Sequence, residues 1–308
     1  MDLSIVIPVY NEEKNVALLH QSIRNTLDKT DFKYEIIFVD DGSTDNTFNI
    51  LNNLKKIKII KFRKNFGQTA AMMAGFENSN GKVIVSLDGD LQNDPSDIPK
   101  LIEKLNEGYD AVSGWRYNRK DSFSKVLFSK FANSFRQLLI KDPVHDSGCS
   151  LRAYKKECLS EIELYGEMHR YIPAILNWKG FKLSEVKVNH FPRKNGKTKY
   201  NMWRIHKGFM DLMNVWFWRK YSSRPLHIFG GAGVILGTFG TILGFGLIIA
   251  RQFYGMSLGQ SQLPLLAVLM VVIGVQFFIS GLLADISIKN YYGHNGRKTY
   301  SVEKIVEK

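Results

Sequence analysis

The sequence contains little cysteine and lacks several signatures that define common protein classes. Its 308 residues include only two cysteines, Cys149 and Cys158, which fits a reduced cytoplasmic domain and leaves no cluster suited to zinc. No GxGxxG sequence follows the first apolar segment and no Walker A sequence occurs, so Rossmann dinucleotide sites and P-loop sites are excluded. The first residues, MDLSIVIPVY, have neither a basic segment nor a cleavage site, so we expect no signal peptide here.

Charged residues are absent from two long stretches near the C-terminus. Residues 226–250 and 252–284 contain no Asp, Glu, Lys or Arg, and each stretch can supply the ~20 apolar residues that a membrane-spanning helix needs. We predict helices at about 226–250 and 263–285, joined by the turn RQFYGMSLGQSQ. The frequent glycines of the first stretch are tolerated in membrane helices and allow close packing. The alternative is a pair of buried helices in a soluble domain.

Basic residues flank the two stretches on their outer sides, whereas the turn between them holds only Arg251. These flanking residues are Arg219, Lys220 and Arg224 before the first stretch, and Lys289, Arg297 and Lys298 after the second. The positive-inside rule then places both chain ends in the cytoplasm. We therefore expect a multi-pass protein of the inner (plasma) membrane, with the N-terminal domain and both termini cytoplasmic.

Positive charge is concentrated just before the first uncharged stretch. The formal net charge is +13, and eleven Lys or Arg stand against two acids between Lys182 and Arg224. A basic stretch can bind nucleic acid, but a position next to a membrane helix favours anionic lipid headgroups or a phosphorylated lipid. Residues 200–225 add Trp, Phe and Met side chains, which predicts amphipathic helices at the headgroup level. Residues 122–140 have a similar character, with an ordinary helix packed on the domain as the alternative.

The first 115 residues alternate between strand-like and helix-like segments. The strand-like segments are residues 3–10, 34–43, 57–62, 82–88 and 109–115. The helix-like segments between them are residues 11–27, 43–54, 67–79 and 95–108. This alternation predicts an α/β fold with a mostly parallel sheet and helices on both faces. In such folds, ligands bind outside the carboxyl ends of the strands.

An acidic motif, DGDLQ, follows the fourth predicted strand. If the strand continues, Asp88, Asp90 and Gln92 lie on one face of an extended chain. Three oxygen donors of this kind suit Mg²⁺ or Mn²⁺. An EF-hand loop is excluded because its sixth and twelfth positions hold Asn93 and Pro99. The other alternative is a strand that simply ends in turn-forming residues.

Polar residues also follow the other predicted strands. Tyr10 and Glu12 follow the first strand, Asp40 and Asp41 end the second, and Arg116 follows the fifth. Acids at three strand ends and an arginine at a fourth predict a site for a charged ligand that is bridged by a metal ion.

Five segments, taken together, resemble the family 2 glycosyltransferases of the GT-A fold. They are VIPVYNEEKNV, EIIFVDDGSTDNT, DGDLQNDP, DSGCSLRAY and RKNGKTKY. The likeness is strongest to the polyprenyl-phosphate branch, which includes dolichyl-phosphate mannosyltransferases and bacterial undecaprenyl-phosphate glucosyltransferases. Processive polysaccharide synthases carry a QxxRW motif that is absent here. The resemblance covers nearly the whole chain. It implies a GT-A catalytic domain at 1–199, juxtamembrane amphipathic helices at 200–225, a two-helix transmembrane hairpin at 226–288 and a cytoplasmic tail at 289–308.

The resemblance also implies roles for individual residues. The positions matching the nucleoside site are Pro8, Tyr10, Glu12, Asp40 and Asp41, and those matching the Mg²⁺ or Mn²⁺ ligands are Asp88, Asp90 and Gln92. The positions matching the acceptor and diphosphate side are Arg116, Asp146, Arg152, Arg193, Lys197 and Lys199. Of these residues, Asp90, Arg116, Asp146 and Arg152 are the expected catalytic set. Gly89 stands where alanine is common in the family, and we expect it to loosen the turn. The segment KNGKTKY resembles a mobile loop that closes over bound diphosphate.

The implied reaction is inverting, metal-dependent transfer of one sugar from a nucleotide diphosphate sugar, with UDP-glucose expected, to undecaprenyl phosphate. The alternatives are UDP-N-acetylglucosamine or GDP-mannose as donor, another lipid acceptor such as diacylglycerol, and a non-catalytic membrane scaffold. A phosphate monoester has a second pKa near 6, so such an acceptor is largely ionised and needs little general base catalysis. The role of Asp146 stays open among base, orienting group and arginine partner. Glycine-rich spans also allow a homo-oligomer.

Overall fold

The computed structural model describes residues 1–117, 143–162, 164, 166–192, and 225–294 except 256, 258 and 260, together with a few positions between 210 and 221. It divides into two compact units, Met1–Val215 and Trp216–Lys308. The predicted helix at 122–140, the basic loop from Arg193 to Lys199 and most of the predicted juxtamembrane segment lie outside the described residues.

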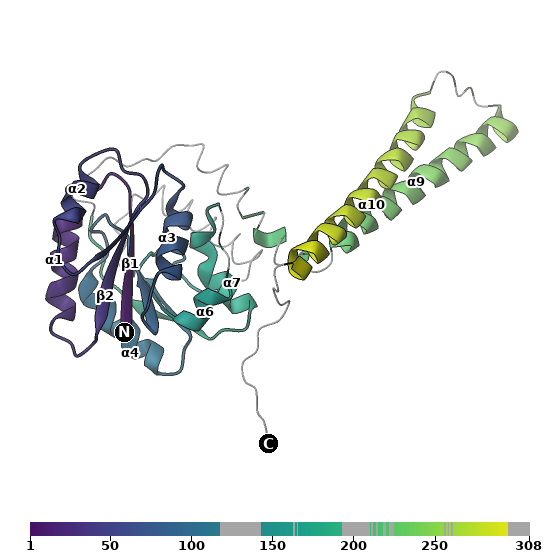
Figure 1. Cartoon of the computed structure of the whole chain (residues 1–308). Helices are drawn as coiled ribbons and strands as arrows, with labels where there is room; N and C mark the ends of the chain where they lie inside the picture. Colours follow the sequence, from purple (N-terminus) through teal and green to yellow (C-terminus); the bar gives the residue numbers. More distant parts are fainter. Residues whose placement is uncertain are drawn as a thin grey trace. The chain divides into compact units, whose positions relative to one another are not determined.

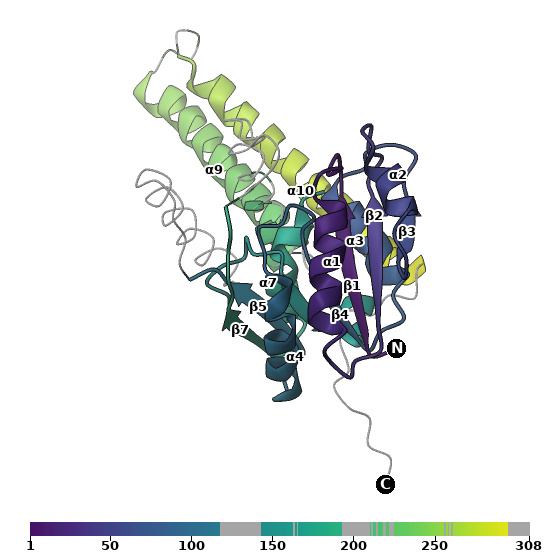
Figure 2. The same ribbon diagram turned by 90° about the vertical axis from the view of Figure 1, so that its left-hand side faces the viewer.

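The N-terminal unit is built on a seven-stranded sheet with the order β3-β2-β1-β4-β6-β5-β7. Helices lie on both faces of this sheet (Figures 1 and 2). The strands are β1 Leu3–Val9, β2 Tyr34–Asp40, β3 Lys58–Lys61, β4 Val83–Ser86, β5 Ala111–Trp115, β6 Arg152–Lys155 and β7 Leu183–Lys187. The helices are α1 Val16–Leu27, α2 Thr47–Asn52, α3 Gln68–Glu77, α4 Ile98–Asn106, α6 Lys156–Ser160 and α7 Ile172–Trp178. Two 3₁₀ turns, Pro95–Asp97 and Met168–Tyr171, precede α4 and α7. All five predicted strands are present.

The central strand β1 is covered on both faces, as its continuous apolar sequence predicts. Ile5 and Ile7 are fully buried in a core that includes residues of α1 and α4, and these two helices lie on the face of the sheet that points to the viewer in Figure 2. On the opposite face, Val6 packs against α3. A Cβ atom added to Gly75 of α3 would lie only 2.2 Å from Val6 Cγ1, so helix and strand approach closely there.

Strand β6 is the main addition to the predicted fold. It runs antiparallel to both of its neighbours, β4 and β5, whereas the remaining pairs of the sheet are parallel. Arg152 at its start is paired with Ser86 of β4 and Ser113 of β5. Because β6 is reversed, its first residue lies at the edge where β4 and β5 end. The segment before β6 therefore reaches the expected ligand-binding edge.

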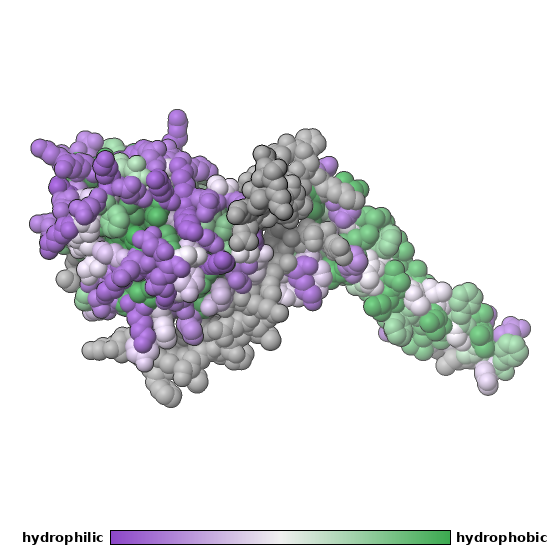
Figure 3. Space-filling model, turned by 90° about the horizontal axis from the view of Figure 1, so that it is seen from below, coloured by the Kyte–Doolittle hydropathy of each residue, from purple (hydrophilic) through white to green (hydrophobic). Residues whose placement is uncertain are grey.

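The C-terminal unit contains two long helices, α9 Pro225–Tyr254 and α10 Leu263–His294. They run four and nine residues, respectively, past their predicted ends at 250 and 285. Both contain a segment long and apolar enough to cross a membrane. Their outer surface is apolar (Figure 3) and exposes large side chains such as Phe245 and Leu265. The two helices pack against each other through glycine residues. A Cβ atom added to Gly274 would lie 2.7 Å from the carbonyl oxygen of Gly233, so the two backbones approach closely.

Candidate active site

The predicted site lies where the order of the sheet changes direction. From β1 the chain adds β2 and β3 on one side of the sheet, and then β4 on the other. Polar residues follow the carboxyl ends of β1, β2, β4 and β5, and the start of β6 lies at the same edge. This is the position at which open α/β sheets bind their ligands.

Hydrogen bonds join the loops that follow β1 and β2. The side-chain oxygen of Asn11 accepts from the main-chain N of Thr44 at 2.8 Å, and the main-chain N of Asn11 donates to Ser43 Oγ at 2.9 Å. The main-chain N of Glu12 donates to Thr47 Oγ1 at 2.8 Å. Asn11 adopts φ 57°, a left-handed conformation that asparagine tolerates. These contacts hold the segment containing Tyr10 and Glu12 beside the end of β2.

Asp40 closes β2 and is fully buried. Its Oδ1 accepts from the main-chain N of Ser43 at 2.9 Å, while its Oδ2 is buried without a hydrogen-bond partner in the described structure. A buried polar atom of this kind is costly unless it is paired. An unpaired acceptor at this position is consistent with the predicted contact to a nucleobase N–H, which stays a prediction. Pro8, Tyr10 and Glu12, which are also predicted to bind the nucleoside, are half-buried at and just after the end of β1.

Asp41, the next residue, contacts main chain on both oxygens. Oδ1 accepts from the N–H of Phe66 at 2.7 Å and Oδ2 from the N–H of Gly67 at 3.0 Å. Burial raises the pKa of Asp41 above its ordinary value, although these two N–H groups act in the opposite direction. Its observed contacts therefore hold the loop that enters α3, and a contact with the nucleoside stays a prediction.

The acidic motif forms a turn. Strand β4 ends at Ser86, so the continuation that would place Asp88, Asp90 and Gln92 on one face of a strand does not occur. Leu91 adopts φ 62°, which is uncommon for a residue of this type. Asp90 is only 7% exposed, and its Oδ1 accepts from the main-chain N of Gln92 at 3.1 Å. The three predicted ligands therefore lie in a turn and not on one face of a strand.

Gly89, in the middle of this turn, packs closely against the end of β1. A Cβ atom added to Gly89 would lie 2.7 Å from Val9 Cγ1 and 3.4 Å from the carbonyl oxygen of Pro8. The structure shows close packing at Gly89, and the expectation that this glycine loosens the turn stays a prediction. Its missing side chain lets the acidic turn pack against the end of β1, next to the predicted nucleoside residues.

The pKa of Asp88 reflects its burial and the charges around it. Burial raises the pKa of Asp88 to about 6, and the neighbouring charge of Asp90 adds to this effect, while Arg152 and Arg116 act in the opposite direction. Within the described residues, no group of three or more His, Cys, Asp or Glu side chains is arranged to hold a metal ion. Two carboxylates and an amide fit Mg²⁺ or Mn²⁺, because these ions complete their shell with water and substrate phosphate.

Arg116 and Asp146 form a two-point ion pair. Arg116 Nε lies 2.6 Å from Asp146 Oδ2, and Arg116 Nη2 lies 2.8 Å from Asp146 Oδ1. Both side chains are nearly buried, at 11% and 12% exposed. The main-chain N–H groups of His145 and Asp146 donate to Glu185 of β7, which fixes the loop that carries Asp146. Among the three roles left open for Asp146, the structure shows that of arginine partner.

Arg152 is buried, at 3% exposed, and donates to main-chain oxygens. Its Nη1 lies 2.9 Å from the carbonyl oxygen of His169, and its Nη2 donates to the carbonyl oxygen of Ser147. Arg152 lowers the pKa of Asp88 because its positive charge favours the ionised carboxylate. It is thus a fixed cation beside the acidic turn, and its contact with an acceptor phosphate stays a prediction.

The segment after β7 runs beside the acidic turn. The main-chain N of Phe191 donates to the carbonyl oxygen of Gln92 at 2.8 Å, and His190 pairs with Asn93 in an isolated antiparallel bridge. His190 Nε2 also lies 3.3 Å from Arg116 Nη1. This contact was not predicted, although VNHFP directly precedes the basic motif. The chain therefore enters the predicted loop of Arg193, Lys197 and Lys199 next to the acidic turn.

Gln68, at the start of α3, is a second site residue that was not predicted. Its Nε2 donates to Asp88 Oδ1 at 2.8 Å. The available signal was a polar residue at the start of the helix that follows the third strand, which places it at the same sheet edge.

Comparisons with known proteins agree with this geometry. Residues 4–163 match the family model of glycosyl transferase family 2. The chain is 34% identical over 319 residues to the dodecaprenyl-phosphate galacturonate synthase of Rhizobium johnstonii, which covers 100% of this chain and 94% of that protein. It is 35% identical over 312 residues to the undecaprenyl-phosphate 4-deoxy-4-formamido-L-arabinose transferase of Shewanella sediminis, which covers 99% of this chain and 92% of that protein.

A solved structure confirms the GT-A fold. The glucosyl-3-phosphoglycerate synthase of Mycobacterium tuberculosis, in complex with Mn²⁺, UDP and glucosyl-3-phosphoglycerate, superposes with a TM-score of 0.56 at 18% identity, over 71% of this chain and 79% of that one. Because the chain is similar over its full length to enzymes named as a synthase and a transferase, it is an enzyme and not a non-catalytic membrane scaffold. The chain therefore belongs to glycosyl transferase family 2, as a membrane glycosyltransferase of the polyprenyl-phosphate type.

Proposed function

We propose that this protein transfers one sugar, with inversion, from a UDP-sugar to the phosphate of a polyprenyl phosphate at the cytoplasmic face of the membrane. The observation that carries the proposal is the pairing of opposite charges at one sheet edge. The acidic turn with Asp88 and Asp90 lies within electrostatic reach of Arg116, which Asp146 holds in place. Such an arrangement suits a reaction between two phosphate-bearing substrates, one bound through a metal ion and the other through arginine.

In this proposal, residues at the ends of β1, β2 and β4 bind the sugar donor. The free oxygen of Asp40 accepts from the base, and Glu12 from the ribose. Asp88, Asp90 and Gln92 would hold Mg²⁺ or Mn²⁺, which when bound neutralises the diphosphate leaving group. The solved relative that contains Mn²⁺ and UDP supports this assignment through its similar fold.

In this proposal, Arg116 binds the phosphate of the acceptor. A polyprenyl phosphate is largely dianionic at neutral pH because its second pKa is near 6. One of its oxygens attacks the anomeric carbon directly, and the bond from that carbon to the diphosphate breaks, so no proton has to be removed. Arg116 aligns the acceptor phosphate and screens its repulsion with the donor. A neutral hydroxyl acceptor, as in diacylglycerol, would need a general base. Asp146 suits that task poorly because both of its oxygens bind Arg116.

The donor sugar is proposed to be of the uronic acid or formamido-arabinose type. Glucose was expected from the sequence alone, but the two relatives described above are named for galacturonate and for 4-deoxy-4-formamido-L-arabinose. Their acceptors are named as dodecaprenyl and undecaprenyl phosphate, which supports a polyprenyl phosphate here.

A donor screen with the purified full-length protein tests this proposal. Undecaprenyl phosphate and Mn²⁺ are supplied with one donor at a time: UDP-galacturonate, UDP-4-deoxy-4-formamido-L-arabinose, UDP-glucose, UDP-N-acetylglucosamine or GDP-mannose. The lipid product is identified by mass spectrometry. We expect one of the first two donors to give the glycosylated lipid. Product from UDP-glucose alone would restore the original expectation for the sugar. Donor turnover that is independent of the lipid phosphate would contradict the proposed acceptor.

A further inference from the structure

We propose that Gln68 is a positioning residue that orients Asp88 for metal binding, and that Asp41 acts through Gln68. The inference rests on the proposed function, because Asp88 is a metal ligand only in that reaction. It assigns Asp41 a task different from the expected nucleoside contact.

The first step of the argument is the contact between Gln68 and Asp88. Gln68 Nε2 donates to Asp88 Oδ1 at 2.8 Å, and Ser150 also bonds to this carboxylate. Leu87, the preceding residue, is 1% exposed, so the backbone at this point is held by the core. The remaining freedom of Asp88 is rotation of its carboxylate. A neutral amide donor restrains that rotation without adding a charge that would compete with a cation.

The second step is how Gln68 itself is held. It is the first residue of α3, and the preceding Gly67 adopts φ 97°, a left-handed conformation that favours glycine. The N–H groups of Gly67 and Phe66 both donate to Asp41. The main-chain N of Asp41 in turn donates to the carbonyl oxygen of Val9 at 2.9 Å. A chain of hydrogen bonds therefore runs from β1 through Asp41 and the loop to Gln68.

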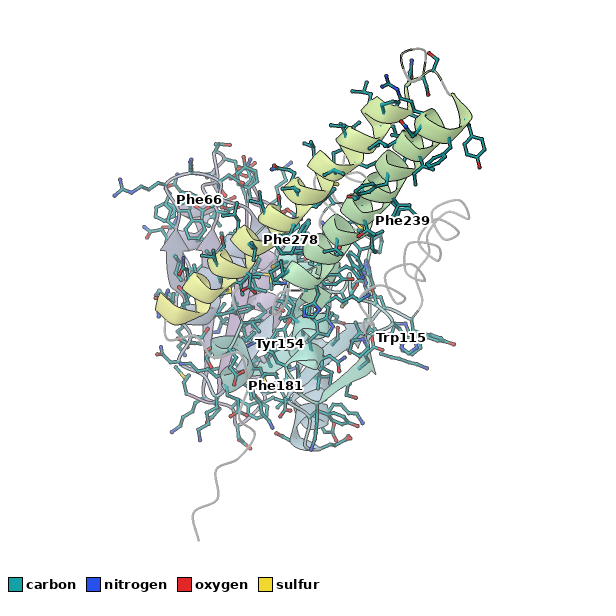
Figure 4. The ribbon with its side chains drawn as sticks, turned by 90° about the vertical axis from the view of Figure 1, so that its right-hand side faces the viewer. Phe66, Trp115, Tyr154, Phe181, Phe239 and Phe278 are labelled. Atoms are coloured by element: carbon teal, nitrogen blue, oxygen red, sulfur yellow. The ribbon has the colours of Figure 1, made fainter. Side chains whose placement is uncertain are left out.

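The third step is that the side chain of Phe66 contributes little apolar packing to this loop. Phe66, labelled in Figure 4, contacts the Phe62 ring edge-on with a centroid separation of 5.7 Å, and the residue is 58% exposed. On the far side of Gln68, the buried Thr69 bonds to His169 Nδ1 at 2.7 Å. The two hydrogen bonds to the buried Asp41 carboxylate add the restraint directly before Gln68. Removing them should loosen Gln68 and, through it, Asp88.

The test measures Mn²⁺ binding by the full-length protein in the presence of UDP, using the electron paramagnetic resonance signal of free Mn²⁺. Gln68→Met keeps the length of the side chain but removes the donor. We expect the Mn²⁺ dissociation constant to rise about tenfold, the lower end of the effect of losing a residue that orients a metal ligand. UDP binding without metal should be unchanged. Gln21→Met, at an exposed glutamine of α1, is the matched control and should bind Mn²⁺ as the wild type does.

A double-mutant cycle tests the role of Asp41. Asp41→Asn should weaken Mn²⁺ binding in the same direction, and the double variant should lose little more than the stronger single variant, because both changes remove one linkage. Gln68→Asn provides a second variant in case Gln68→Met unfolds. It keeps the amide but is one methylene too short to reach Asp88, so it should also weaken Mn²⁺ binding.

The outcomes separate this inference from the proposed function. Wild-type Mn²⁺ affinity in Gln68→Met and Gln68→Asn, with binding lost in Asp90→Asn, would overturn the role of Gln68 and leave the metal site in place. Unchanged Mn²⁺ binding in Asp90→Asn would overturn the metal site itself. Fully additive effects of Asp41→Asn and Gln68→Met would show that Asp41 acts independently of Gln68.

Discussion

Arg116 and Asp146, 30 residues apart in the chain, form a two-point ion pair with Nε–Oδ2 and Nη2–Oδ1 distances of 2.6 and 2.8 Å. The main-chain N of Arg116 also lies 3.3 Å from Asp146 Oδ2. The carboxylate thus fixes both the backbone and the guanidinium of Arg116 at the end of β5. From this contact we expect Asp146 to act in the reaction by orienting the cation of Arg116.

Asp146→Asn should reduce transfer without abolishing it. The amide keeps one acceptor oxygen for Arg116 but turns an NH₂ group toward the other donor, so the guanidinium loses its fixed geometry. We expect kcat to fall about 10- to 100-fold, as for other residues that orient a reacting group, and KM for the lipid phosphate to rise. Steady-state kinetics at varied acceptor concentration measure both parameters. An inactive variant that binds both substrates normally would instead make Asp146 a general base.

Much of this site could be read from the sequence because parallel strands with both faces buried have a distinctive pattern. Residues 3–9, for example, form one apolar run that ends in polar residues. The acidic strand ends Asp40 and Asp88 were placed correctly at the carboxyl edge for the same reason. Strand β6 was not predicted, because its four residues, RAYK, are too few to show the apolar pattern of a strand. Its position between β4 and β5 depends on contacts with distant parts of the chain.

The details of the site depended on conformations and contacts that no local pattern encodes. The left-handed conformation of Leu91 ends the extended geometry assumed for the acidic motif, and leucine has no preference for it. The hydrogen bond from Phe66 to Asp41 spans 25 residues, and the one from Gln68 to Asp88 spans 20. Sequence reasoning identified the carboxylates but could not tell a carboxylate that binds main chain from one that is open to a ligand.

The stability of the metal-free protein should depend on pH through Asp88. Its pKa is raised to about 6 in the folded state, against about 3.9 in an unfolded chain. The carboxyl group therefore loses its proton at lower pH in the unfolded chain than in the folded protein. As a result, the free energy of unfolding falls by roughly 3 kcal/mol as pH rises from about 4 to about 6. Asp88→Asn should melt with a flatter pH dependence across this window, measured by differential scanning fluorimetry. Asp31→Asn, at an exposed aspartate, should keep the wild-type slope. Equal slopes in all three proteins would show that Asp88 does not titrate there.

The helical hairpin should depend on Gly274. A Cβ atom there would lie 2.7 Å from the carbonyl oxygen of Gly233 and from the main-chain N of Gly237, so Gly274→Val has to push α9 and α10 apart. Overpacking of this kind costs about 1–3 kcal/mol, and we expect less folded protein in the membrane fraction. Gly246→Val is the control, because a Cβ atom at Gly246 meets nothing within 4 Å. Equal yields of the two variants would contradict tight packing of the hairpin.

Both chain ends should lie in the cytoplasm, with the loop between α9 and α10 on the opposite side. Ser257→Cys places a thiol in that loop, whereas the native Cys149 and Cys158 are buried and should react slowly. A membrane-impermeant maleimide should label Ser257→Cys from outside intact cells or spheroplasts. Labelling only after permeabilisation would reverse the topology.

The most direct test of the proposed reaction is transfer by Asp90→Asn and by the wild type in chelator. Asp90 is almost fully buried in the acidic turn, so the change removes one ligand charge at nearly constant volume. With the best donor and undecaprenyl phosphate, we expect the wild type to form glycosylated lipid, to stop in EDTA and to recover with Mn²⁺ or Mg²⁺. Asp90→Asn should give no product above background, although its N-terminal domain should still fold and melt cooperatively. Full transfer by the wild type in EDTA, or by Asp90→Asn, would contradict a reaction that uses a metal ion held by the acidic turn.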